Sequence, residues 1–289
     1  MTPPTVQGPY EAVVFAGGGC RCFWQAGFWA EAAPALGLQP AVVGGVSAGS
    51  AFACAIFAGV MEPVLEYFKQ RVDANQRNVY LANAWRGGRV FPHEEIYRDT
   101  ILNTIDAEAF EQLQAGPDVR ITVARPPDRI GARSGYLLAA LAYQGDRLTR
   151  PVHARWGRRL GFTDEAISVR SCSNSAEVAD LILQSSCSPP ATPLYRRGGR
   201  VVLDGGLVDN APVHAVQPAR HTLVLLSWHR DESQLPRIPG RTYVQPSRPI
   251  PIDKWDYTDA EGVQRSYDLG RSDGEAFARR PRLDSSEAA

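Results

Sequence analysis

The segment Gly45-Val-Ser-Ala-Gly49 places a serine between two glycines with the spacing Gly-x-Ser-x-Gly. This spacing is typical of a nucleophile elbow, a tight strand-to-helix turn that strains the serine backbone and exposes its hydroxyl. The glycines Gly45 and Gly49 let neighbouring backbone approach without a side-chain clash. An apolar run over 41–44 precedes Ser47 and a helix-like run follows it. We therefore interpret Ser47 as a catalytic nucleophile, with a chance match in a Gly/Ser-rich turn as the plain alternative.

Three consecutive glycines, Gly17, Gly18 and Gly19, lie between the first predicted strand and the first predicted helix. Amides without neighbouring side chains can face a developing oxyanion, so this turn is a candidate oxyanion hole. The same amides could equally hold a phosphate at a helix N-terminus. A dinucleotide fingerprint needs a glycine where Cys22 stands, and no Gly-Lys-Ser/Thr follows, so both common nucleotide motifs are disfavoured.

Asp204 closes a predicted strand and is followed by Gly205 and Gly206. Ligands of doubly wound sheets bind at the carboxyl ends of parallel strands, and we expect the Asp204 carboxylate at that edge. Taken alone, an Asp-Gly pair is more often an ordinary turn. Asp204 becomes a candidate catalytic residue only when the serine and glycine motifs are considered with it.

The three motifs, in this order and at these spacings, resemble the patatin-like phospholipase family. The family pattern is Gly-Gly-Gly-x-Arg/Lys-Gly, then Gly-x-Ser-x-Gly, then Asp-Gly-Gly or Asp-Gly-Ala, and here residues 17–22 read Gly-Gly-Gly-Cys-Arg-Cys. Segments 185–190 and 267–270 are also similar to parts of that family. The resemblance extends from about residue 13 to about residue 270, which is nearly the whole chain.

The resemblance implies a serine lipid acyl hydrolase, of the phospholipase A or lipase type, with a catalytic dyad of Ser47 and Asp204. Asp204 would take the proton of Ser47 directly, and water would hydrolyse the acyl-enzyme in a second step. An ordinary aspartate is too weak a base for this, so a dry pocket must raise its pKa. The scheme requires no metal or other cofactor. The expected partner is a lipid or other acyl ester, including one at a membrane surface.

The chain departs from the family pattern at Cys22, which stands where the first motif ends in glycine. Because a side chain there could crowd the loop, Gly18 and Gly19 are the expected amide donors. Arg21 matches the family's basic residue, and its charge could favour an anionic intermediate or a lipid phosphate. Two thiols, Cys20 and Cys22, without a second ligand pair are weak evidence for a metal. The predicted substrate-binding loop comprises Gly17, Gly18, Gly19, Cys20 and Arg21.

Two other functions stay open. An α/β-hydrolase with a Ser-Asp-His triad is permitted by chain order, because His214, His221 and His229 follow Asp204. Against a triad, only one strand and one helix precede the elbow. We expect His214 to cap or line the helix after Asp204, and His93 and His153 to be surface residues in loops. The third reading is a non-catalytic patatin-like protein that binds a lipid.

Strands alternating with helices predict an α/β fold with three α/β/α layers and a mostly parallel central sheet. A single domain of residues 1–289 is expected, with its core at about 11–279 and frayed ends. We expect Pro34 to end the first helix at about residue 33, and 235–251 to be loop. Strands are predicted at 11–15, 41–44, 119–124, 200–204 and 222–227, and helices at 62–71, 94–105, 133–144, 176–185 and 257–279.

Composition excludes some classes of protein. The 289 residues carry 31 basic and 31 acidic side chains, and this zero net charge gives no support for a nucleic-acid binder. No stretch approaches the roughly 20 apolar residues that span a bilayer, and residues 1–10 do not resemble a secretory signal. Five scattered cysteines indicate reduced thiols and a cytoplasmic protein, with peripheral membrane association left open. Aromatic residues at 23, 24, 28 and 29 are expected in the core.

Overall fold

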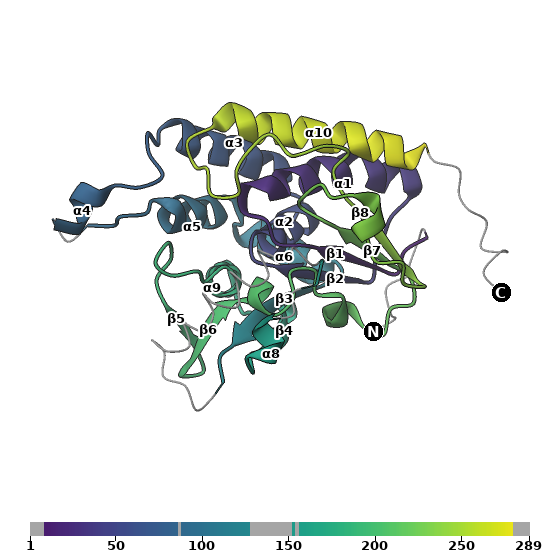
Figure 1. Ribbon diagram of the computed structural model, residues 1–289, viewed down its shortest axis with the longest axis horizontal. Helices are drawn as coiled ribbons and strands as arrows, with labels where there is room; N and C mark the ends of the chain where they lie inside the picture. Colours follow the sequence, from purple (N-terminus) through teal and green to yellow (C-terminus); the bar gives the residue numbers. More distant parts are fainter. Residues whose placement is uncertain (1–8, 86–87, 128–151, 154–155, 280–289) are drawn as a thin grey trace.

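A single mixed sheet forms the centre of the computed structural model, which describes residues 9–85, 88–127, 152–153 and 156–279 (Figure 1). The strand order is β5-β6-β3-β2-β1-β7-β8. The remaining strand, β4, is not part of this order and pairs with β3. The parallel strands are β1 (Ala12–Phe15), β2 (Val42–Val46), β3 (Asp118–Arg125), β7 (Thr222–Leu225) and β8 (Arg241–Val244). The antiparallel strands are β4 (Thr163–Ser168), β5 (Tyr195–Arg197) and β6 (Arg200–Asp204). The predicted α/β class with a mostly parallel sheet is confirmed.

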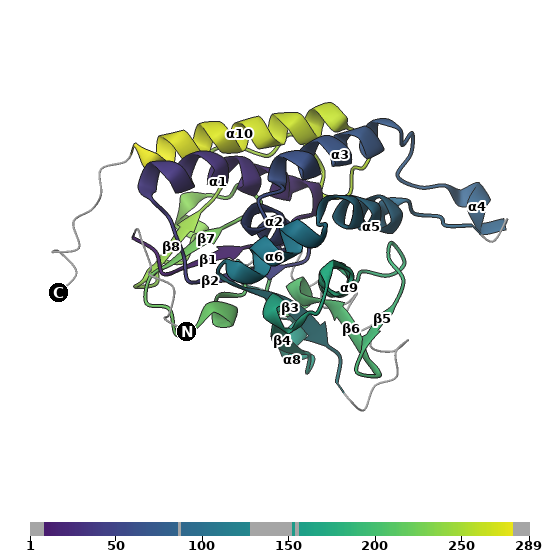
Figure 2. The ribbon, with the colours of Figure 1, turned by 180° about the vertical axis from the view of Figure 1, so that it is seen from behind.

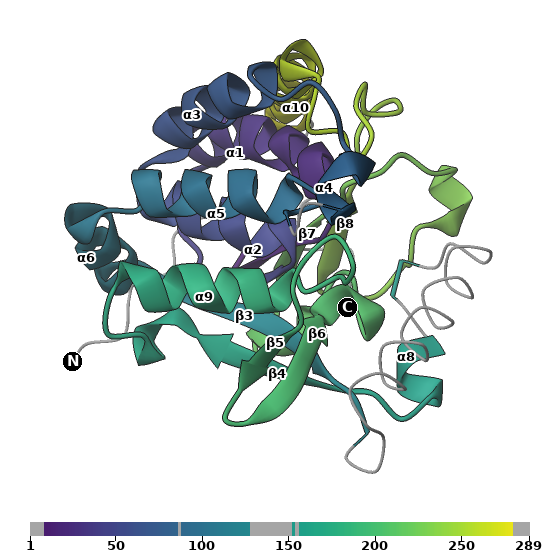
Figure 3. The ribbon, with the colours of Figure 1, turned by 90° about the vertical axis from the view of Figure 1, so that its left-hand side faces the viewer.

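Apart from the short helices α4 (Leu81–Trp85) and α8 (Trp156–Arg159), the helices lie on one face of the sheet (Figures 2 and 3). The long helix α10 lies along α1 in Figures 1 and 2, and this approach requires glycine, because a Cβ on Gly270 would lie 2.1 Å from the Trp24 carbonyl oxygen. The helices are α1 (Phe23–Leu36), α2 (Ala48–Phe57), α3 (Met61–Asp73), α4 (Leu81–Trp85), α5 (His93–Thr104), α6 (Ala107–Ala115), α8 (Trp156–Arg159), α9 (Ser175–Ser185) and α10 (Ala260–Ala278).

The two faces of the central strands bury different clusters. Alternate residues such as Val13 and Phe15 of β1 pack in the larger cluster, together with Trp24, Phe28 and Trp29 of α1. Their neighbours Val14 and Val224 face the other side, where the 3-10 turn η4 (Val213–Val216) covers them. Trp24 and Phe28 are fully buried, so the prediction that these aromatic residues lie in the core is confirmed.

Two details of the elements differ from the sequence-based expectation. Pro34 does not end the first helix, because α1 continues to Leu36 and stops at Gly37, whose φ is 62°. Pro34 lies in the last turn, so its missing donor costs a single helical hydrogen bond. The helix still ends in a glycine cap, in which the Leu38 amide donates to the Ala33 carbonyl oxygen at 2.9 Å. The stretch 235–251 is not all loop, since β8 extends the parallel sheet. The predicted helix 133–144 and the tail 280–289 lie outside the described residues.

Candidate active site

Ser47 occupies the turn between β2 and α2 with a φ of 53° and a ψ of −135°. Within the described ranges it is the one non-glycine residue with a positive φ. Such a conformation costs about 1–3 kcal/mol and persists only where its surroundings enforce it. Here the Ser47 amide donates to Ser185 Oγ at 2.8 Å, and Ser185 Oγ donates to the Thr122 carbonyl oxygen at 2.7 Å. The strained turn is therefore tied to α9 and β3.

Both glycines of the elbow are needed for space. A Cβ on Gly45 would lie 2.7 Å from Ser50 Cα, and one on Gly49 would lie 2.4 Å from the Phe15 carbonyl oxygen. These contacts are with backbone atoms, which cannot move aside as a flexible side chain can. The spacing Gly-x-Ser-x-Gly thus follows from the packing of α2 against β1 and β2, as expected from the motif.

Asp204 reaches the same edge of the sheet by a different route from the one expected. The strand β6 is antiparallel to β3 and pairs only with its last part, Val123 with Asp204 and Ala124 with Leu203. Its chain therefore enters from beyond the carboxyl ends of the parallel strands and stops at them. Gly205 then passes so close to β3 that a Cβ would lie 2.3 Å from the Thr122 carbonyl oxygen. The expected strand 200–204 is confirmed, and its end lies at the edge of the sheet where the parallel strands stop; the strand itself runs antiparallel to β3.

The surroundings of Asp204 raise the pKa of its carboxyl group. Burial is the largest cause, and it is opposed by the Gly206 amide, by hydrogen bonding with the Ser47 side chain, by the charge of Lys254 and by Ser188. The Gly206 amide lies 2.8 Å from Oδ1, and Ser188 Oγ lies 3.4 Å from Oδ2. Asp204 and Ser47 are both partly accessible. Asp204 thus has a carboxyl group that burial makes more basic, and the Ser47 side chain is close enough to affect its pKa.

The glycine-rich turn lies directly against Ser47. A Cβ on Gly17 would be 3.3 Å from Ser47 Cβ. The Gly17 amide is already used, because it donates to the Asn210 carbonyl oxygen at 3.1 Å. In contrast, the amides of Gly18 and Gly19 have no hydrogen-bond acceptor among the described residues. Gly18 and Gly19 are therefore the free donors of this turn, and Gly17 is its anchor.

Two side chains hold the carbonyl group of Gly17 from the other side. Asn210 Nδ2 donates to the Gly17 carbonyl oxygen at 3.0 Å, and Ser227 Oγ donates to it at 2.5 Å. Asn210 follows the Asp204 turn, where a Cβ on Gly206 would lie 2.9 Å from Asn210 Oδ1. Asn210 consequently links the glycine-rich turn to the turn that carries the carboxylate.

The remaining residues of the predicted substrate-binding loop contact other parts of the chain. Arg21 binds the Ile252 carbonyl oxygen and Asp253, each at 3.2 Å, and Cys20 Sγ donates to the Asp256 carbonyl oxygen at 3.2 Å. Cys22 Sγ lies 3.5 Å from the Ala16 carbonyl oxygen and 3.2 Å from where a Cβ on Gly18 would be. Burial raises the pKa of both thiols, so both stay protonated and are poor metal ligands.

An apolar pocket begins beside the nucleophile. Its empty space, counted with its open mouth, is about 480 Å³. One wall is the face of α2 that carries Ala48, Ala51, Phe52 and Ala55, and Phe23, α3, α5 and Tyr257 form the others. The threonine hydroxyls of α5 that line it donate to carbonyl oxygens of their own helix. The lining therefore offers little polar contact to an occupant.

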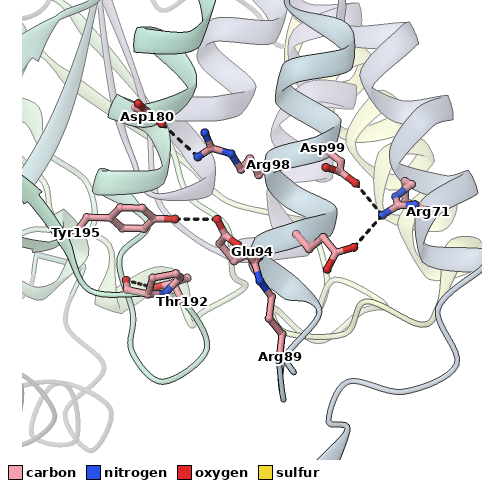
Figure 4. Close-up of polar contacts among 10 residues, drawn as sticks. Arg71, Arg89, Glu94, Arg98, Asp99, Asp180, Thr192 and Tyr195 are labelled. Atoms are coloured by element: carbon pink, nitrogen blue, oxygen red, sulfur yellow. Dashed lines mark hydrogen bonds and ion pairs between the residues drawn. The ribbon is translucent and has the colours of Figure 1, made fainter. Parts of the chain in front are cut away.

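Ion pairs connect the helices that form this pocket (Figure 4). Arg71 of α3 lies 2.8 Å from Asp99 of α5, and Arg98 of α5 lies 3.2 Å from Asp180 of α9. These pairs are partly exposed, and such pairs contribute about 0–1 kcal/mol each. They therefore contribute little to the stability of the fold.

The histidines lie in other surroundings. Across the described residues, none of the five forms a hydrogen bond or ion pair with Ser47 or Asp204. His214 pairs with Asp164, and His153 contacts Asp209 at 2.9 Å. The expectation that His93 is a surface loop residue is wrong, because it begins α5 and is 5% exposed.

Several residues of this site were not identified from the sequence. Ser185 and Ser188 belong to the segment 185–190 that was singled out as a whole, whereas Asn210 and Ser227 belong to no motif. Asn and Ser are common in turns, and their distance along the chain from Ser47 conceals their role. No pattern in the sequence marks which of them reaches the glycine-rich turn.

Comparisons with known proteins identify a family for most of the chain. The family model described as patatin-like phospholipase matches residues 13–216. A similar solved structure is that of VipD from Legionella pneumophila, which is 12% identical, with a TM-score of 0.47. The match covers 94% of this chain and 67% of the VipD chain. A search of curated proteins found no significant match.

Proposed function

Because this chain belongs to the patatin-like phospholipase family, we propose that it is a serine lipid acyl hydrolase with Ser47 as nucleophile and Asp204 as its base. The observation that carries the proposal is a strained, partly accessible serine whose side chain influences a carboxyl group of raised pKa. The family suggests the substrate class, a lipid acyl ester, and the geometry supports the roles proposed for the two residues. Residues 11–279 would act as one catalytic domain.

The proposed reaction has two steps, acylation of Ser47 and hydrolysis of the acyl-enzyme. Ser47 Oγ attacks the ester carbonyl carbon while Asp204 accepts the hydroxyl proton, and the carbonyl oxygen becomes negatively charged. The free amides of Gly18 and Gly19 stabilise this oxyanion. The intermediate collapses, Asp204 returns the proton to the departing alcohol oxygen, and an acyl-Ser47 ester remains. Water, deprotonated by Asp204, then attacks that ester. The second intermediate collapses, Asp204 returns the proton to Ser47 Oγ, and the fatty acid is released.

The apolar pocket supports an acyl substrate. It starts at Ala48, the residue after the nucleophile, and continues along α2 to Ala55. Each methylene of an aliphatic chain placed there would move from water to apolar contacts, which would contribute about 0.8 kcal/mol to the free energy of binding. Burial of the acyl chain in this pocket would also hold the ester carbonyl near Ser47, so that binding orients the ester for attack.

The alternatives receive less support. A Ser-Asp-His triad needs an imidazole within hydrogen-bond reach of the serine. In the part of the chain that the structure describes, no histidine is bonded to Ser47 or Asp204, and four of the five bond to other groups. A non-catalytic lipid-binding protein would share the pocket but would have no use for a strained serine beside a carboxyl group of raised pKa. Such strain clusters at functional sites.

A fluorophosphonate probe tests the proposal, because it labels only an activated serine. The wild-type chain is expected to be labelled on Ser47, and to hydrolyse lipid or p-nitrophenyl esters. Ser47→Ala and Asp204→Asn should abolish labelling or turnover with the fold intact by circular dichroism. Ser233→Ala, which removes an exposed serine, and His214→Ala serve as controls. An unlabelled wild-type protein would exclude the hydrolase, and loss of turnover in His214→Ala would favour the triad.

The structure also bears on the membrane. Among the described helices, none is both long and apolar enough to cross a bilayer. A lipid substrate would therefore have to be reached from the surface of its membrane or micelle by this part of the chain.

A further inference from the structure

An exposed apolar loop projects from the molecule beside the pocket. The loop, here called the arm, comprises the described residues 75–85 and 88–92, and its α4 lies far from the sheet in Figures 1 and 2. Trp85 is 94% exposed, Leu81 71% and Val79 42%. Single exposed apolar side chains are ordinary on proteins. Here three exposed apolar side chains lie within seven residues of a projecting loop, where they contribute little to the fold. Such a cluster indicates a surface that binds another molecule or a membrane.

The arm holds its own shape. The Tyr80 amide donates to the Val90 carbonyl oxygen at 2.8 Å, which closes the loop at its neck. Near the tip, the Gly88 amide donates to the Asn83 carbonyl oxygen and Asn83 Nδ2 donates to the Arg89 carbonyl oxygen, each at 2.9 Å. Leu81 and Trp85 are therefore presented by a hydrogen-bonded loop rather than by an open chain.

The composition of the arm differs from that of the whole chain. Between Ala74 and Pro92 the sequence has three arginines, of which Arg89 pairs with Glu94 just beyond the stretch, and no aspartate or glutamate, whereas the chain as a whole is balanced. The same stretch holds Tyr80, Trp85 and Phe91. Cations mixed with aromatic and aliphatic side chains suit the headgroup region of a bilayer, where rings sit at the interface and arginines attract anionic lipids.

The first root of the arm is bonded to the segment that borders the active site. Asn75 Nδ2 donates to the Tyr257 carbonyl oxygen at 2.7 Å, and Asn78 Oδ1 accepts from the Tyr257 amide at 2.8 Å. Tyr257 lines the apolar pocket. In the same segment, the Lys254 carbonyl oxygen accepts from the Cys20 amide at 3.1 Å, next to the free amides of Gly19 and Gly18. The arm and the glycine-rich turn thus share one support.

The second root is anchored on α5. Arg89 pairs with Glu94, a nearly buried carboxylate that also accepts from Tyr195 Oη at 3.0 Å (Figure 4). Glu94 precedes Tyr97 of the same helix, which lines the pocket. Both ends of the arm are therefore fixed on walls of the pocket.

We propose that the arm is a docking surface for bilayers that contain anionic phospholipid, with Leu81 and Trp85 inserting among the headgroups. The inference rests on the proposed function, because docking here would bring the pocket and the glycine-rich turn close to ester groups of the bilayer. A protein partner would also cover apolar side chains. The acid-free, arginine-bearing composition and the anchorage on an acyl pocket favour a lipid surface.

Flotation of the full chain with vesicles tests the proposal. Vesicles of phosphatidylcholine alone are compared with vesicles of phosphatidylcholine and phosphatidylglycerol. The wild type is expected to float with the mixed vesicles, less so at raised ionic strength. The double variant Leu81→Ser/Trp85→Ser should lose about tenfold or more in partition, since two buried side chains contribute most of the apolar term. Trp156→Ser, which removes a 38% exposed tryptophan on α8, should bind as the wild type does.

Two readouts separate this inference from the proposed function. Flotation reports docking even if no ester is hydrolysed, and hydrolysis of a short, water-soluble ester should be the same in the double variant and the wild type. Equal flotation of the double variant, or no flotation of the wild type, would overturn the docking surface. An oligomer of the wild type that the double variant dissociates would likewise overturn it, in favour of a second copy of this chain.

Discussion

The substitution Ala55→Leu tests whether the pocket along α2 holds the acyl chain. Ala55 is 2% exposed and lines that pocket, eight residues beyond Ser47. At about 1.5 Å per residue, the helix carries this position about 12 Å from the nucleophile. The larger side chain would add three carbon atoms to the wall at that depth. Acyl chains that end before Ala55 should be unaffected, and longer chains should meet the new side chain.

The expected magnitude follows from these dimensions. An extended chain advances about 1.2 Å per bond, so about ten carbons lie between the ester and Ala55. Displacing three methylenes removes about 0.8 kcal/mol each, or about 2.4 kcal/mol. At about 1.4 kcal/mol per factor of ten, kcat/KM should fall roughly 50-fold for acyl chains clearly longer than ten carbons. For butyrate and hexanoate esters it should stay within about twofold of the wild type.

The assay is a series of p-nitrophenyl esters of increasing acyl length, measured as kcat/KM for each variant. Ala30→Leu, the same change at an exposed position of α1, is the matched control and should leave the profile unchanged. Thermal unfolding shows whether the Ala55→Leu variant overpacks the helix, which would lower activity for every ester alike. A profile that keeps its wild-type shape in well-folded Ala55→Leu would refute the acyl pocket.

Further predictions concern Asp204 and Asn210. Asp204→Asn should lower kcat by about three orders of magnitude or more, yet raise the unfolding temperature at neutral pH, as differential scanning calorimetry would show. Burial raises the folded pKa of Asp204, so the native state loses stability as pH rises from the unfolded pKa to the folded one. The gain from the Asp204→Asn change should therefore vanish at low pH; a gain that is independent of pH would contradict the assigned cause. Wild-type kcat should fall as pH drops through that raised pKa, and an acid limb at the pKa of an ordinary aspartate would contradict it. Asn210→Ala removes one hydrogen bond to the Gly17 carbonyl oxygen and should lower kcat about fivefold with little change in KM; an effect on KM alone would exclude a role in positioning the turn.

Local motifs in the sequence were enough to predict the elbow and the glycine-rich turn. A positive φ at Ser47 and the approach of α2 to β1 both demand glycine at fixed distances along the chain, so the backbone geometry is visible in the order of residues. The buried strands were visible for a similar reason, since strands covered on both faces become continuous apolar runs. The fold class follows from how these runs alternate with helices.

Contacts between distant segments were less predictable. The prediction for Pro34 failed because the stop signal at Gly37 lies beyond it. β6 was assigned as a strand, but whether it runs parallel or antiparallel depends on which part of β3 it pairs with. Neither choice changes the apolar pattern of Arg200 to Asp204, so the pattern cannot distinguish them.

The sequence by itself determined that a serine elbow, a glycine-rich turn and an Asp-Gly-Gly turn exist, because each is a short-range backbone requirement. Only the tertiary structure decided that Asn210 joins two of these turns, that α2, α3 and α5 enclose an apolar pocket, and that the arm is rooted on its walls. Such contacts join residues far apart in the chain. They depend on how whole helices and strands pack, and side chains as common as Asn and Ala carry no local mark of the partner they will meet.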